Sequence, residues 1–153
     1  MLDEKDQRIL ELLQQDASLS TYAITKKSGI PQTTVLNRVK KLKEEGIIKR
    51  YTLDIDWKKL GLNNKALIFI KVDKNAEQKG SKVGEIEKKI SRYPLVLNVK
   101  RLMGKHDFMV ELVCKDIDEL NDFLIKRIRS LPEIADTETV MILEEWKKEG
   151  GGI

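Results

Sequence analysis

The sequence predicts an α+β protein of two domains, because the hydrophobic periodicity changes along its 153 residues. In the first fifty residues apolar side chains recur every three to four positions, as on one face of a helix. After residue 64, segments with alternating apolar residues are separated by segments with helical spacing. Basic residues are also unevenly spread: residues 26–50 hold eight Lys and Arg against two Glu, within a chain of net charge +4.

Three short helices are expected in the first domain. Asp3, with Asp6 three residues later, has the spacing that is typical of a helix start. Ser20 can cap a second helix that Gly29 ends. Pro31 presets the backbone for a third helix, which Gly46 ends. The expected inward-facing residues are Ile9, Leu10, Leu13 and Ala17 in the first helix, Ala23 and Ile24 in the second, and Val35, Val39 and Leu42 in the third.

The next segment marks a domain boundary. Residues 47–56 alternate with period two, which predicts a strand or wing, and Gly61 with two asparagines indicates a linker. Four parts are therefore expected: a winged helix-turn-helix domain at 1–50, a strand or linker hinge at 51–64, an α/β domain at 65–147 and a tail at 148–153.

The second domain follows the order βαββαβ. The expected elements are a strand at 65–73, a helix at 81–91, strands at 96–103 and 107–114, a helix at 118–130 and a strand at 137–146. This order predicts a ferredoxin-like fold, a four-stranded antiparallel sheet with both helices on one face. Ile68 and Ile70 fall on one side of the first strand, and Leu67 and Phe69 on the other, so the second face also needs a cover. A homodimer is the simplest cover.

The third helix has the features of a recognition helix that reads double-stranded DNA. When Val35, Val39 and Leu42 face the core, the polar side chains of this helix point outward. In a major groove, Asn can pair with adenine, Thr can contact thymine, and Lys can reach guanine or phosphate. The alternative is a solvated lysine-rich face, and for Arg38 an ion pair with an acidic residue of the first helix competes with a phosphate contact. The expected DNA-binding residues are Gln32, Thr33, Thr34, Asn37, Arg38, Lys40 and Lys41.

Several other classes of protein are disfavoured. The single cysteine, Cys114, excludes an intrachain disulfide and alternates with apolar residues on a strand, so a packed thiol is expected. No His and Cys grouping has metal-ligand spacing, no GxGxxG, P-loop or catalytic triad occurs, and no cofactor or enzymatic activity is expected. The acidic N-terminus and the lack of a long apolar run favour a cytoplasmic protein without a membrane span.

The chain resembles the leucine-responsive and asparagine-responsive (Lrp/AsnC) transcriptional regulators of bacteria and archaea, and an archaeal member is expected. Pro31 departs from the serine cap that is usual in the family. The matching stretches are LDEKDQRILELLQQDA, SGIPQTTVLNRVKKLKEEGIIKRY, DIDWKKLG, GKHDF and TETVMIL, which together cover nearly the whole chain.

The resemblance implies a dimer built through the ferredoxin-like domain, which binds a pseudo-palindromic operator and assembles further into tetramers or octamers. It also implies that an amino acid or related metabolite binds at the turn between the second and third strands. Glycine there allows close approach of backbone amides to a carboxylate, and an aspartate can accept bonds from an ammonium group. The alternative is an ordinary tight turn. The expected effector-binding residues are Gly104, Lys105, His106, Asp107, Thr137 and Thr139.

Two other functions remain as alternatives. Siroheme decarboxylases have a similar architecture, but their chemistry uses histidines, and His106 is the only one in this chain. The second alternative is a sensor protein that joins mixed oligomers without binding DNA. The basic third helix argues against this alternative.

Overall fold

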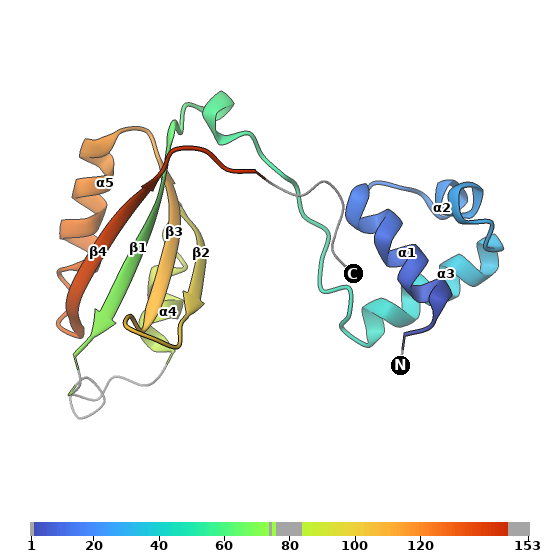
Figure 1. The fold of residues 1–153 in the computed structure, drawn as a ribbon, viewed down its shortest axis with the longest axis horizontal. Helices are drawn as coiled ribbons and strands as arrows, with labels where there is room; N and C mark the ends of the chain where they lie inside the picture. The colour runs from blue at the N-terminus through green and yellow to red at the C-terminus, as the bar shows by residue number, and fades with distance from the viewer. Residues whose placement is uncertain (1, 74, 76–83, 147–153) are drawn as a thin grey trace. The chain divides into compact units, whose positions relative to one another are not determined.

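A computed structural model describes residues 2–73, 75 and 84–146, which divide into two compact units (Figure 1). The N-terminal unit extends to Asp54, and the C-terminal unit spans Ile55–Glu145. Each has its own hydrophobic core. The N-terminal core contains Ile9, Leu10, Leu12, Leu13, Ile24, Ile30, Val35 and Leu42.

The N-terminal unit contains three helices, as predicted: α1 (Glu4–Gln15), α2 (Thr21–Ser28) and α3 (Gln32–Glu44). Asp3 and Asp6 form a capping box at the start of α1, and the Ser20 side chain caps α2. Gly29 ends α2 with φ +72°, a conformation that glycine adopts without the steric cost of a β-carbon. These local signals confirm the predicted helix starts, but Ala17, expected to face inward in the first helix, lies beyond its end at Gln15 and is exposed.

The strand expected at residues 47–56 is not present. These residues are described, and none of them belongs to a strand. The Ile48 amide donates to the Leu42 carbonyl at the end of α3, a helix-ending contact. An alternating pattern forms a strand only where a partner completes the hydrogen-bond ladder, and the described chain supplies none here.

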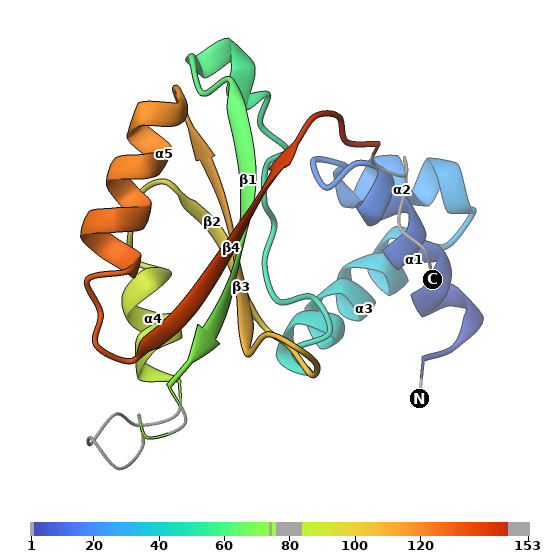
Figure 2. The same ribbon diagram turned by 60° about the vertical axis from the view of Figure 1, so that its left-hand side comes forward.

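The C-terminal unit is the predicted ferredoxin-like fold. After a short 3₁₀ turn η1 (Trp57–Leu60) come β1 (Asn64–Val72), α4 (Glu85–Ile90), β2 (Val96–Arg101), β3 (Phe108–Cys114), α5 (Ile117–Phe123) and β4 (Ile134–Ile142). The strands form one antiparallel sheet in the order β2-β3-β1-β4. Figure 2 shows α4 and α5 on the same face of this sheet.

The last strand and the second helix of this unit differ most from their predicted bounds. The last strand starts earlier and ends at Ile142, because Ile142 pairs with Lys65 near the start of β1 and a bulge at Lys71/Val72 brings Ile134 into register. The helix expected at 118–130 changes after α5 into a π-helical turn, η2 (Leu124–Ile128). The start of the helix expected at 81–91 and the tail at 148–153 lie outside the described residues.

The two faces of the sheet differ as the sequence predicted. Ala66, Ile68 and Ile70 of β1 are fully buried under the helices. Leu67 and Phe69 on the other face, which we call the open face, are only half-buried, and Val140 beside Leu67 is 42% exposed. The single chain therefore leaves an apolar sheet face accessible.

Candidate functional site

The outer surface of α3 is the first candidate site. Val35 and Leu42 are buried in the N-terminal core, which fixes the orientation of the helix about its axis. Thr34 is half-buried at the edge of the outer surface, and the predicted DNA-binding residues with exposed side chains are Gln32, Thr33, Asn37, Lys40 and Lys41. The structure therefore brings these side chains to one accessible surface.

The start of α3 is held against α2. The Ser28 hydroxyl donates to the Ile24 carbonyl at 2.7 Å and accepts from the Ile30 amide at 3.2 Å across the turn. The Gln32 side-chain amide donates to the Thr21 hydroxyl at 3.4 Å. These contacts position the first turn of α3, the part of a recognition helix that meets base edges.

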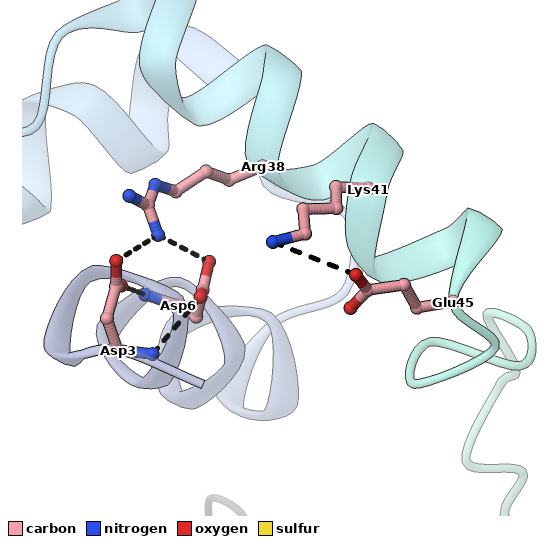
Figure 3. A network of polar contacts seen from close by, with 5 residues as sticks. All are labelled: Asp3, Asp6, Arg38, Lys41 and Glu45. Atoms are coloured by element: carbon pink, nitrogen blue, oxygen red, sulfur yellow. Dashed lines mark hydrogen bonds and ion pairs between the residues drawn. The ribbon is translucent and has the colours of Figure 1, made fainter. Parts of the chain in front are cut away.

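Arg38 forms an ion pair with both acidic residues of the α1 capping box (Figure 3). Its Nη1 lies 2.5 Å from Asp3 Oδ2 and 2.9 Å from Asp6 Oδ1, and the Asp6 side chain is only 6% exposed. Hydrogen bonds from the Asp6 amide and then from Arg38 lower the pKa of Asp3, and the two carboxylates raise the pKa of Arg38. Of the two roles considered for Arg38, the structure contains the ion pair, which ties α3 to α1.

Lys40 and Lys41 of α3 make only long, solvated ion pairs. Lys40 Nζ lies 3.8 Å from Glu44 and Lys41 Nζ 3.7 Å from Glu45, one turn further along the helix, and all four side chains are exposed. Exposed ion pairs of this kind contribute little to stability, so a phosphate can compete for the ammonium groups. Lys40 and Lys41 are therefore available for a polyanion.

The turn between β2 and β3 is the second candidate site. The Leu102 amide donates to the Asp107 carbonyl at 2.9 Å and closes the turn. Gly104 has φ +153° within it, and a β-carbon added there would meet no atom within 4 Å. The glycine is therefore required by the backbone conformation, and the space beside it is open.

Asp107 has a structural contact that the sequence did not predict. Its Oδ2 accepts from the Val72 amide at 2.7 Å, and its own amide donates to the Ile70 carbonyl at 2.9 Å. Asp107 therefore braces the end of β1 at the bulge. The Lys71 ammonium donates to the Lys105 carbonyl at 2.9 Å and holds the same turn.

His106 and Lys105 both meet Glu138 on β4. His106 Nε2 lies 3.3 Å and Lys105 Nζ 3.7 Å from Glu138 Oε2, and the His106 ring centroid is 5.3 Å from that of Phe69. The His106 side chain is only 16% exposed. Sequence reasoning missed Glu138, because its position opposite Phe69 is set by the pairing register of β1 and β4.

Thr137 and Thr139 do not join this group within one chain. They pair with Ile70 and Ile68, the helix-covered side of β1, so they lie on the face opposite Glu138. The Thr137 hydroxyl also accepts from Arg129 Nε at 2.9 Å. The six predicted effector residues therefore form two groups in the single chain.

The described residues contain little that supports other chemistry. Cys114 is fully buried, and burial raises the pKa of its thiol, as expected for a packed side chain. Among the described residues no group of three or more His, Cys, Asp and Glu could hold a metal ion. No helix in the described ranges is long and apolar enough to cross a membrane.

Comparisons with known proteins cover both units. Residues 65–151 match the family described as the Lrp/AsnC ligand binding domain, and residues 2–49 match the winged helix-turn-helix DNA-binding family. The chain is 34% identical over 147 residues to the HTH-type transcriptional regulator FL11 of Pyrococcus horikoshii, covering 96% of this chain and 93% of the relative. It is 37% identical over 149 residues to the transcriptional regulator AzlB of Bacillus subtilis, covering 97% and 92%.

Solved structures show the same fold. AsnC of E. coli superposes with a TM-score of 0.80 at 27% identity, over 95% of this chain and 94% of that one. The regulator NMB0573 of Neisseria meningitidis, whose structure is an L-Met complex, superposes with a TM-score of 0.87 at 22% identity, over 97% and 94%.

Proposed function

This chain belongs to the Lrp/AsnC family of transcriptional regulators, and from that premise we propose that it binds a pseudo-palindromic operator through α3 as a homodimer that responds to an amino acid. The observation that carries the DNA-binding role is the exposed polar surface of α3, held by a buried core stripe on its other side. The relatives are named as transcriptional regulators, which favours a protein without enzymatic activity.

Affinity and sequence choice come from different residues of α3. Lys40 and Lys41 neutralise phosphates, which supplies affinity that falls with salt. Gln32, Thr33, Thr34 and Asn37 face base edges in the major groove and supply sequence choice. Arg38 acts mainly by tying α3 to α1, because both of its carboxylate partners belong to that helix.

Two variants separate these roles. Asn37→Ala should relax the base preference at one operator position and weaken operator binding by about tenfold or more. Lys41→Ala should weaken operator and random DNA alike and reduce the salt slope by about one. Binding of the full chain to duplexes selected from a random pool, measured by fluorescence anisotropy at several salt concentrations, tests both. Equal losses on operator and random DNA for Asn37→Ala would contradict the assigned roles.

The open face is the proposed dimer interface. Its accessible apolar residues, Leu67, Phe69 and Val140, lie opposite the helix-covered face and would be covered by the same residues of a second copy. Residues 51–64 would then act as hinges that let two α3 helices enter successive major grooves, about 34 Å apart. Tetramers or octamers would form from such dimers, and the protein would act in the cytoplasm.

The β2–β3 turn is the proposed effector site. Open space beside Gly104 lets backbone amides approach a carboxylate, and the carboxylate of Asp107 can accept from an ammonium group. Lys105 and His106 lie at the same turn, and Thr137 and Thr139 would come from a neighbouring chain. The L-Met complex of the Neisseria regulator supports an amino acid as the ligand class.

Asp107→Asn tests the ammonium contact. An asparagine oxygen can still accept from the Val72 amide, so the brace is retained while the negative charge is lost. Calorimetric titration with the twenty L-amino acids should identify a ligand for the unmodified chain and at least about tenfold weaker binding for Asp107→Asn. The control is Asp118→Asn, which removes the charge of an exposed carboxylate on α5. Equal binding by both variants would refute the role of Asp107.

A further inference from the structure

Leu36 is an exposed apolar residue in the middle of the polar outer surface of α3. Its side chain is 57% exposed, whereas Val35, one position earlier, is completely buried. It is the only large hydrophobic residue on α3 that the described structure leaves exposed. Isolated apolar residues are ordinary on a protein surface, so the position of Leu36 matters more than its exposure.

The helical neighbours of Leu36 are the residues that the proposed function places in the major groove. Gln32 and Thr33 lie four and three positions earlier, Lys40 lies four positions later, and Asn37 follows directly. A helical side chain leans toward the N-terminus of its helix, so Leu36 covers the turn of Gln32 and Thr33. The contact from Gln32 to Thr21 holds that turn in place.

An apolar side chain at this position has one specific partner in the major groove. Thymine is the only standard base with a methyl group there, and the other bases present hydrogen-bond donors and acceptors that leucine cannot pair with. We propose that Leu36 is a specificity-determining residue that contacts a thymine methyl group once in each operator half-site. This inference rests on the proposed reading of DNA by α3.

The expected effect is small and does not depend on salt. Removing one buried methyl group should weaken binding about fourfold per half-site. A nonpolar contact releases no counterions, so the effect should be the same at low and high salt, unlike the effect of Lys40 or Lys41. This difference separates a methyl contact from an indirect change in phosphate binding.

The experiment uses the full chain and duplexes selected from random DNA. In each selected duplex, thymines are replaced by deoxyuridine one symmetric pair at a time, which removes only the methyl group. The unmodified chain should lose affinity at the pair of positions that Leu36 contacts, and Leu36→Ala should bind the thymine and deoxyuridine forms equally at that pair, whereas any pair contacted by Thr33 or Thr34 should stay sensitive in both. Ile125→Ala, at 59% exposure on η2, is the matched control and should keep the thymine preference.

The outcomes separate this inference from the function on which it rests. If operator selection succeeds but no deoxyuridine replacement weakens binding, or if Leu36→Ala keeps the same sensitivity, the methyl contact is wrong and DNA reading by α3 stands. If no sequence is enriched at all, the proposed function fails and this inference fails with it. Alanine preserves helix propensity, so circular dichroism of Leu36→Ala should be unchanged.

Discussion

Val35→Ala should lower the free energy of unfolding of the N-terminal unit and leave its choice of DNA sequence unchanged. Val35 is fully buried and packs in the same core as Ile9, Ile24 and Leu42. The substitution removes two buried methyl groups, which contribute about 0.8 kcal/mol each to the free energy of unfolding. A residual cavity of roughly 50 Å³ would cost about 1 kcal/mol more.

Alanine partly offsets this loss because its helix propensity exceeds that of valine by roughly 0.6 kcal/mol. The net loss is therefore about 2 kcal/mol. A unit of this size has a free energy of unfolding of roughly 3–8 kcal/mol, so the loss is a large fraction of the total. The melting temperature of the unit should fall by roughly 15–20 °C.

Hydrogen exchange of the full chain, followed by mass spectrometry, reports the opening free energy of α1 and α3 separately from the sheet. Val35→Ala should lower it in these helices, with Leu36→Ala as the matched control that leaves it unchanged. At 25 °C most of the Val35→Ala protein stays folded, so the preferred operator should be the same. A loss below about 0.5 kcal/mol in Val35→Ala would refute the packed position of Val35, because buried large-to-small substitutions cost more.

Three further outcomes are expected. Because the pKa of Asp3 is lowered from 3.8 in the folded chain, its carboxylate stabilises the N-terminal unit above that pH and the effect is lost as pH falls through the lower folded value. Asp3→Asn should therefore reduce the acid dependence of thermal unfolding between about pH 5 and 2. Leu67→Glu should weaken self-association in sedimentation experiments, and Ile125→Lys on the helix layer should not. Cys114 should react with iodoacetamide only after denaturation, and fast labelling of the folded chain would contradict its burial.

Most of the secondary structure could be predicted because its signals are local. The capping residues Asp3 and Ser20 and the left-handed Gly29 are close in sequence to the groups they satisfy. The alternation around Ile68 likewise depends only on the two-residue period of a strand. These patterns were sufficient for the helices of the first domain, the βαββαβ order of the second and the outward direction of Asn37, but not for residues 47–56, which form no strand.

Contacts between distant residues could not be predicted in the same way. Arg38 was compatible with a phosphate contact or an ion pair, and only the packing of α3 beside α1 places it between Asp3 and Asp6. The sequence also contained no local sign that the Asp107 carboxylate would accept from the Val72 amide. A side chain with several chemically suitable partners is assigned only when the fold brings one of them near.

The candidate effector site shows this division most clearly. The turn around Gly104 is a local feature, and its glycine and charged residues are visible in the sequence. Strand register is a long-range property: it sets Glu138 beside Phe69 and His106, and it turns Thr137 to the other face of the sheet. Local patterns thus specify which elements form and which way their side chains alternate, whereas only the pairing of strands and helices decides which side chains meet, because that pairing depends on the packing of the whole chain.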